Sequence, residues 1–304
     1  MIAVQFLIIL IVPFLFIGLI NRTKAVWAGR RGAPLLQPFY DFFKLLRKGE
    51  VISKTTTFIF RLSPSLQLAA VFLAALILPL PGGDSLLHFP ADFVLFAYAL
   101  GLARFFMIIA ALDTGSSFEG MGASREVTFA TIVEPAFFIL LGSLVLISGQ
   151  NSFESIFASI DSSDGFSILV KILCTVSLFI MLLVEGSRVP VDDPNTHLEL
   201  TMIHEVMALD YSGPDLAFIQ YASALKMVLI GTLLANIIIP YSLGAALSLT
   251  LYLALLAVIA ITIGFIESWM ARLRMSHVPQ FIFLMTALSL AAFVVVLFFM
   301  YGGF

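Results

Sequence analysis

The sequence is poor in cysteine and in charge, and both shortages narrow what the chain can be. It has one cysteine, Cys174, and that residue lies inside an apolar run. Neither a disulfide framework nor an iron–sulfur site held by four thiolates can be built from it. Only 12% of the residues are charged and 61% are hydrophobic, with a mean hydropathy of +1.07, which excludes a soluble domain. The net charge of -3 is too small to indicate nucleic acid as a partner.

Nucleotide and metal motifs are also missing. Gly115, Gly120 and Gly122 do not form the G-x-x-x-x-G-K pattern that cradles phosphates. His197 and His204 are two helical turns apart, but no third ligand follows at a suitable spacing, and H-E-V-M-A is not the zinc motif H-E-x-x-H. We therefore expect this chain to bind no cofactor or metal itself. The two histidines fit partner contacts or pH-sensitive caps better than ligands.

Long apolar runs recur along the whole chain. Eight of them are long enough to cross about 30 Å of hydrocarbon at about 1.5 Å per residue, and helices satisfy their own backbone groups in lipid. They cover residues 2–21, 65–80, 91–112, 127–149, 166–187, 222–241, 245–267 and 279–300. The sequence thus predicts an all-α, polytopic integral membrane protein, with one membrane domain over residues 1–304, eight transmembrane helices and a helical cytoplasmic loop after the fifth span.

Positive charge falls on one side of these runs. The connections 81–90, 150–165 and 242–244 contain no lysine or arginine. Thirteen lysines and arginines lie in the connections 22–64, 113–126, 188–221 and 268–278. The positive-inside bias places this second set in the cytoplasm, and both termini outside.

The segment PFYDFFKLLRK lies in the first long cytoplasmic connection. As a helix it places apolar and charged side chains on opposite faces: Phe39, Phe42, Phe43 and Leu46 against Asp41, Lys44 and Lys48. One interpretation is an interfacial helix that lies at the lipid headgroups. The other is a helix that lines an entrance between the membrane and a partner, which makes Asp41 and Lys44 candidate docking residues.

Charged residues inside the spans gather in their cytoplasmic halves. Arg104 and Glu134 lie at matching depth on consecutive antiparallel spans, and each needs a partner because a charge in hydrocarbon costs at least about 2.5 to 3.5 kcal/mol. They form either a static salt bridge or a titratable pair in an internal path. Glu267 joins them as a coupling candidate. Asp92 lies near an outer end, where we expect it to reach the surface. Since no ladder of acids and bases crosses the chain, an ion path has to continue through neighbouring subunits.

The acid-rich stretch from Glu185 to Gly213 separates the fifth and sixth spans. Arg188 follows Glu185 by one helical turn, which predicts a contact between them if the helix continues. Asp193 before a proline, or the capping box of Thr196 and Glu199, starts a further helix. Glu199 is either that cap or a carboxylate held in the packed interior, as proton-handling acids often are.

Several of these segments together resemble a known family. The resemblance rests on RRGAPLLQPFYDFFKLLRK, ARFFMIIAALDTGSSFEGMGASRE, VEPAFF, the Glu185–Gly213 loop and ESWMARLR. They are similar to the membrane subunit shared by energy-converting hydrogenases and respiratory complex I, which is called subunit 1 in complex I. The phrases LDTGSSFEGMGASRE and VDDPNTHLELTMIHE are closest to the hydrogenase-4 and formate hydrogenlyase branch.

The resemblance implies a coupling subunit in the inner membrane of a prokaryote. Such a subunit docks a nickel-iron hydrogenase-like large subunit and an iron-sulfur small subunit on its cytoplasmic face, and those partners carry the nickel-iron centre and the clusters. Antiporter-like membrane subunits beside it move protons or sodium ions. The residues carried over from the family, or added from the charge pattern, fall into two groups. For ion translocation and coupling they are Arg104, Glu134, Glu185, Glu199 and Glu267; for docking they are Arg188, Asp192, Asp193, His197, His204, Asp41 and Lys44.

Two other functions stay open at this point. Complex I members carry an acid-rich E-x-x-R-x-P-F-D-L loop beside their quinone chamber. Glu185, Arg188 and Asp192 match it, whereas Val191 and His197 depart from the family pattern. A quinone-site subunit is therefore the second hypothesis, and a stand-alone ion transporter is the third.

Overall fold

A computed structural model describes residues 2–160, 165–192 and 202–301, and helices are the only regular secondary structure in these ranges. The helices are α1 (Ile2–Trp27), α2 (Gln37–Leu46), α3 (Phe58–Ile77), α4 (Asp92–Asp113), α5 (Ser117–Ser148), α6 (Phe153–Ser159), α7 (Gly165–Glu185), α8 (His204–Met207), α9 (Gly213–Ile238), α10 (Ala245–Trp269) and α11 (Val278–Tyr301). Among the described residues, eight helices are long and apolar enough to cross a membrane. This confirms the predicted all-α, eight-span fold.

Helix α9 lies at the centre of the molecule. Its span is 89% buried, whereas the other seven are buried to between 28% and 56%. Its polar side chains bond to neighbouring backbone: the Tyr221 hydroxyl donates to the Ile9 carbonyl (2.7 Å), and the Asn236 amide donates to that of Pro79 (2.9 Å). Such internal bonds allow a helix with polar residues to stay inside an apolar bundle.

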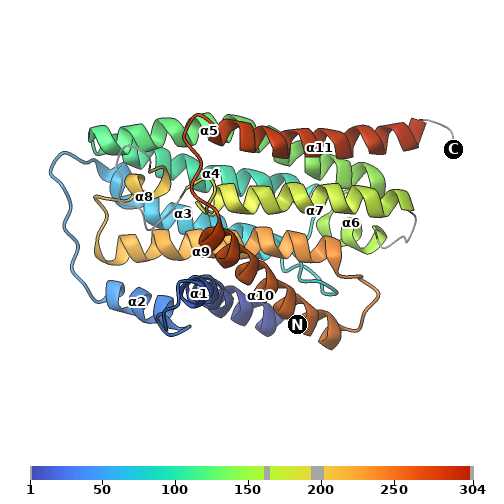
Figure 1. The fold of residues 1–304 in the computed structure, drawn as a ribbon, viewed down its shortest axis with the longest axis horizontal. Coiled ribbons are helices and arrows are strands. Elements are labelled where there is room, and N and C mark those ends of the chain that lie inside the picture. The colour runs from blue at the N-terminus through green and yellow to red at the C-terminus, as the bar shows by residue number, and fades with distance from the viewer. Residues whose placement is uncertain (1, 161–164, 193–201, 302–304) are drawn as a thin grey trace.

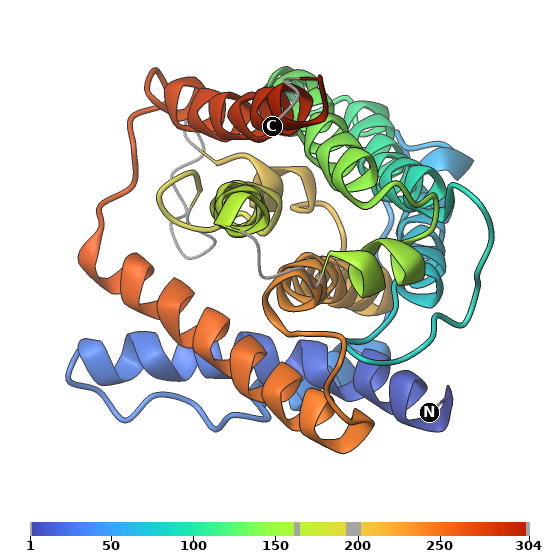
Figure 2. The same ribbon diagram turned by 90° about the vertical axis from the view of Figure 1, so that its right-hand side faces the viewer.

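Helices α1 and α10 cross the long axis of the other spans at a steep angle. Figure 1 shows α1 almost end-on while most helices run across the view, and Figure 2 shows α1 and α10 lying over each other. Gly264 permits this close crossing, because a Cβ atom there would lie 2.7 Å from Cβ of Thr23 and 2.9 Å from the carbonyl oxygen of Ile20.

Helix α2 packs on α1 and α9 through its aromatic face. The Phe39 and Phe42 rings both meet Phe14 at centroid distances of 5.4 Å, and Phe42 also meets Tyr221 at 5.5 Å. Phe43 is exposed. The helix therefore packs through Phe39 and Phe42, whereas Phe43 does not join the predicted apolar face, and Phe42 lines a cavity described below.

Several helices begin earlier than hydropathy predicts. Helix α5 begins at Ser117, ten residues before the start of the predicted span at 127, and α9 begins at Gly213. The reason is that hydropathy marks where lipid begins, while a helix continues wherever its polar side chains find partners. The Glu119 carboxylate, for example, accepts the backbone N–H of Asp210 (3.2 Å).

One expectation from the sequence is wrong. Asp92 does not reach the surface: it is 0% exposed, and its Oδ1 accepts the Phe153 N–H at 2.9 Å. The outer connection folds α6 back over α4, and this covers Asp92.

Candidate functional site

A cluster of ionisable side chains surrounds Arg104 inside the bundle. Its guanidinium contacts three carboxylates: Glu126 through Nε at 3.0 Å, Glu134 through Nη1 at 2.5 Å, and Glu185 through Nη2. Helix α4 provides the arginine, α5 two of the acids and α7 the third. The predicted pairing of Arg104 with Glu134 is confirmed, and it is part of a larger set.

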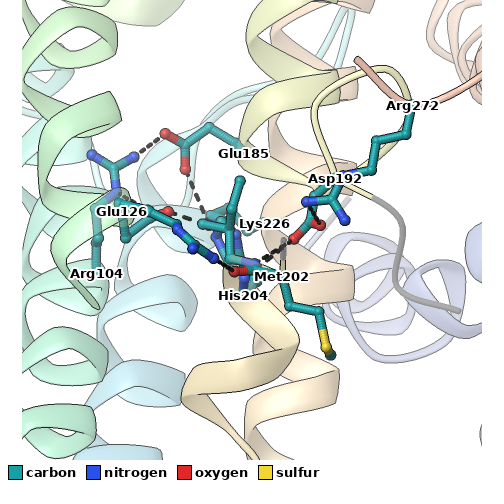
Figure 3. A network of polar contacts seen from close by, with 10 residues as sticks. Arg104, Glu126, Glu185, Asp192, Met202, His204, Lys226 and Arg272 are labelled. Carbon is teal, nitrogen blue, oxygen red and sulfur yellow. Dashed lines mark hydrogen bonds and ion pairs between the residues drawn. The ribbon is translucent and has the colours of Figure 1, made fainter. Parts of the chain in front are cut away.

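Lys226 on α9 completes this set, which we call the Arg104 cluster (Arg104, Glu126, Glu134, Glu185 and Lys226). Its Nζ lies 3.0 Å from Oε2 of Glu185, so this one carboxylate joins two cations (Figure 3). Two cations face three carboxylates. One negative charge is therefore in excess when all five are ionised, and one bound proton neutralises it. Since a buried uncompensated charge is costly, the cluster is suited to take up and release a proton.

The exposure of the cluster is uneven. The side chains of Arg104, Glu126, Glu185 and Lys226 are at most 11% exposed, whereas that of Glu134 is 47% exposed. Glu134 lies near the middle of α5 and contacts Arg104 of α4 from an exposed position. The cluster thus reaches from the interior to the lateral surface at membrane depth.

His204 links the cluster to the connection between α7 and α9. Its Nδ1 lies 3.6 Å from Oε2 of Glu126, while its backbone N–H donates to Oδ2 of Asp192 at 3.3 Å. The other oxygen of Asp192 faces the Arg272 guanidinium at 2.9 Å, and Figure 3 shows the three groups in sequence. Desolvation of its largely buried ring lowers the pKa of His204 below its ordinary value of 6.5, and the opposing pull of Glu126 does not cancel this. His204 is therefore neutral at pH 7.

A second group of charges lies near the C-terminal end of α10. Oε1 of Glu267 lies 3.4 Å from Nη1 of Arg188, and its Oε2 lies 2.8 Å from Nζ of Lys24. The condition for Arg188 to lie one helical turn beyond Glu185, that the helix continues, is not met. Helix α7 ends at Glu185, so Arg188 does not stack one turn above it but points to α10 instead.

A cavity of about 420 Å³ lies between these two groups. The amphipathic helix α2 closes it on one side, and α1, α3 and α9 provide further walls. Polar side chains reach it from both groups, namely Arg188, His204 and Lys226, whereas Phe14, Phe42 and Tyr221 give it an apolar end. The exposed Glu205 lines it as well, so the cavity extends from the surface to the buried lysine.

The predicted docking residues separate into two sets. Lys44 is exposed on α2, and Asp41 is half-buried, accepts the Gln37 amide (2.9 Å) and lines the cavity. Arg188 and Asp192 are buried within the chain, at 6% and 1% exposure. Asp193, His197 and Glu199 lie outside the described residues, and so do both predicted caps of the loop helix.

Sequence reasoning missed three members of the site. They are Glu126, Lys226 and Arg272, none of which the sequence singled out as a site residue. A signal was present for Glu126, which precedes Glu134 by about two turns of one helix. Among residues 2–160, 165–192 and 202–301, no group of three or more histidines, cysteines or acids is arranged to hold a metal ion.

Comparison with known proteins gives one family and several relatives. The NADH dehydrogenase family model matches residues 1–297. Hydrogenase-4 component C of Escherichia coli (strain K12) is 32% identical over 84% of this chain and 79% of its own length. Formate hydrogenlyase subunit 4 of the same organism is 27% identical over 91% of this chain and 92% of its own. These matches confirm the resemblance seen in the sequence.

A solved structure shares the fold at lower sequence identity. A chain of the membrane-bound sulfane sulfur reductase, an archaeal respiratory membrane complex, superposes with a TM-score of 0.81 at 20% identity. That superposition covers 96% of this chain and 98% of the other. The two chains therefore have the same arrangement of helices.

Proposed function

Because this chain belongs to the NADH dehydrogenase family, we propose that it is the membrane-anchoring and energy-coupling subunit of an energy-converting nickel-iron hydrogenase or formate hydrogenlyase-like complex. Electron transfer takes place in a peripheral arm whose subunits hold the nickel-iron centre and the iron-sulfur clusters. This chain links that transfer to ion movement. It lies in the inner membrane of a prokaryote with both termini outside, as the distribution of lysine and arginine favours.

The observation that carries the proposal is the half-exposed carboxylate of Glu134. A charged group that faces hydrocarbon costs at least about 2.5 to 3.5 kcal/mol, and Glu134 is 47% exposed within the apolar run 127–149 of α5. A further membrane subunit on this side removes that cost by offering polar groups. We infer that an antiporter-like subunit covers α4 and α5 here, and that the ion path continues into it.

The cytoplasmic ends of the helices supply the docking face for the peripheral arm. Large apolar side chains are exposed there, with Val51 79% and Phe58 70% exposed, next to cations such as Lys44. Exposed apolar side chains within a charged surface are typical of a protein interface. Arg188 and Asp192 brace this face from behind, because their salt bridges to Glu267 and Arg272 tie the loop after α7 to α10 and to the segment that follows it.

Purification of the chain from native membranes tests the proposal. A tag on this chain in mild detergent should retain a large subunit with two C-x-x-C motifs, an iron-sulfur subunit and antiporter-like subunits. The preparation should evolve hydrogen from a reduced viologen dye. Recovery of the chain alone, with ion transport by the isolated chain in liposomes, would instead establish a transporter.

The cavity favours one other candidate, a quinone-site subunit. Its volume of about 420 Å³ falls in the range of small-ligand pockets, roughly 300 to 1,000 Å³. Its apolar end at Phe42 and Tyr221 and its polar end at Arg188 suit a molecule with a ring headgroup and a hydrocarbon tail. Quinone reduction by the purified complex, blocked by a headgroup analogue, would support this candidate over the first.

A further inference from the structure

His204 occupies a position that neither docking nor helix capping requires. The residue lines the cavity, and its Nδ1 atom is buried without a hydrogen-bond partner among the described residues, although the Oε2 atom of Glu126 is only 3.6 Å away. That separation is a few tenths of an ångström beyond a normal hydrogen bond of about 3 Å. A small rotation of the ring closes it. The imidazole therefore stands between the cavity and the Arg104 cluster.

We propose that His204 is the proton-transfer residue between the cytoplasmic cavity and Glu126, and through Glu126 the Arg104 cluster. The inference rests on the proposed function and states how a proton reaches the Arg104 cluster. In the loading step, Nε2 of the neutral ring takes a proton from water in the cavity, and Nδ1 releases its proton to Oε2 of Glu126. The carboxylate becomes a carboxylic acid, and the imidazole is left as the Nε2–H tautomer. Exchange of its proton with cavity water, or rotation of the ring, resets it.

The charges around His204 suit transfer in either direction. Carboxylates face it from α5 (Glu126) and from the loop (Asp192), and cations face it from α9 (Lys226) and α4 (Arg104). Neither sign of charge dominates, so the ring is not fixed in one protonation state by a single neighbour. Burial shifts its pKa below 6.5, which keeps it neutral and able to accept a proton near pH 7.

Asp192 fixes the backbone and leaves the ring free to move. Oδ2 of this residue accepts the N–H groups of both Ile203 (3.1 Å) and His204 (3.3 Å), while Arg272 holds Oδ1. The two backbone bonds position the start of α8, but no hydrogen bond from the described part of the chain holds Nδ1. A displacement of the loop by a docked partner changes the distance between His204 and Glu126 directly. The same residue thus connects the docking face to the Arg104 cluster.

The test uses the intact complex, purified through this chain and reconstituted in sodium-free liposomes. His204→Gln keeps the side-chain volume but cannot carry a proton, and His204→Ala leaves space next to the cavity. The matched control is His277→Gln, since His277 is exposed and its ring bonds only to the Gln280 side chain among the contacts described for it. Hydrogen evolution with reduced viologen reports the peripheral arm, and quenching of a pH-sensitive dye reports proton movement.

We expect both His204 variants to keep hydrogen evolution within twofold of the parent complex and to lose at least fivefold in proton movement per hydrogen formed. Added imidazole should restore proton movement in His204→Ala but not in His204→Gln, whose side chain fills the space. Rescue by imidazole is not expected of a purely structural histidine. His277→Gln should behave as the parent.

Three outcomes separate the inference from the proposed function. Proton movement unchanged in His204→Gln, or absence of imidazole rescue in His204→Ala, overturns the role of His204 and leaves the coupling function standing. A parent complex that evolves hydrogen but moves no ion, with or without sodium, overturns the coupling function and the inference with it. Transport that requires sodium and is indifferent to His204 also rejects the proton-transfer role alone.

Discussion

Lys226 and Glu185 form a salt bridge of 3.0 Å between the central helix α9 and the last residue of α7, and the second oxygen of the same carboxylate contacts Arg104. Glu185 is thus the point where three helices are joined by charge. It is also the last residue before the loop that leads to the proposed docking face. A change of position in that loop is therefore transmitted to the charge balance inside the membrane.

Glu185→Gln should destabilise the chain and impair coupling. The amide keeps the shape but leaves two buried cations short of one carboxylate, and loss of one partner of a buried pair typically costs about 3 to 5 kcal/mol. We expect a lower melting temperature in detergent and less ion movement per electron. The double variant Glu185→Gln/Lys226→Met should recover part of the melting temperature, because it removes one of the unmatched cations. Lys171→Met, at the opposite end of α7 and partly exposed, serves as the control.

Glu134→Gln should impair ion movement without destabilising the chain. Its side chain is half exposed, so loss of its charge should leave assembly and melting temperature nearly unchanged. Ion movement per electron should fall at least severalfold, since the exit to the neighbouring subunit loses its titratable group. Glu154→Gln, on the outer short helix α6, is the matched control. Coupling as efficient as in the parent complex would contradict the assignment of Glu134 as the exit.

Glu199→Gln tests whether Glu199 caps a helix or handles protons, two roles that come from the sequence alone. Glu199 lies outside the described residues, and its two interpretations give different outcomes. A capping role predicts weaker assembly of the loop. A role in proton handling predicts intact assembly with reduced ion movement per electron. Measurement of both quantities on Glu199→Gln decides between them.

The sequence was sufficient to predict the number and type of the spans. Lipid imposes a length and an apolar composition on any helix that crosses it, so runs such as 166–187 identify α7 to within two residues. Where a helix begins outside the lipid depends instead on the partners that its polar residues find. Helix α5 continues to Ser117 because Glu119 finds a backbone partner at Asp210, 91 residues away, and no local pattern gives that information.

A salt bridge of the site was predictable where two opposite charges lie at the same depth in neighbouring spans. Arg104 and Glu134 lie at the same depth on consecutive helices, and they do pair. The partner of Arg188 depended instead on where α7 ends and on the steep path of α10, which brings Glu267 to it. The proximity of His204 to Glu126 likewise depends on how α8 packs against α5. These are properties of tertiary packing that composition and spacing do not contain.

Arg188→Ala should weaken the attachment of the peripheral arm. The substitution leaves Glu267 with Lys24 as its remaining salt-bridge partner and frees the loop after α7 from α10. We expect a larger share of the hydrogenase subunits to be lost during purification at physiological salt. Arg274→Ala is the control, because Arg274 is exposed in the neighbouring connection. Equal retention of the arm in the two variants would show that Arg188 does not brace the docking face.

His204 should make the chain less stable in mild acid. Its pKa is lower in the folded chain than the ordinary value of 6.5, so the unfolded chain binds more protons as the pH falls. The contribution of this residue to stability is complete above about pH 6.5 and is lost progressively below it. The difference in melting temperature between parent and His204→Gln should therefore shrink from pH 8 to pH 5. A difference that grows toward acid would mean that the ring is stabilised in its charged form.

Gly264→Leu should force α1 and α10 apart. A side chain at this position meets Cβ of Thr23 at 2.7 Å and the backbone oxygen of Ile20 at 2.9 Å, and backbone cannot give way cheaply. Overpacking of this kind costs about 1 to 3 kcal/mol or more. The wall that α1 contributes to the cavity is displaced by the same change. We therefore expect a lower melting temperature together with weaker coupling, whereas Gly142→Leu on α5, where a Cβ atom meets no atom within 4 Å, should change neither by a comparable amount. Equal effects of the two substitutions would show that the close crossing of α1 and α10 does not support the site.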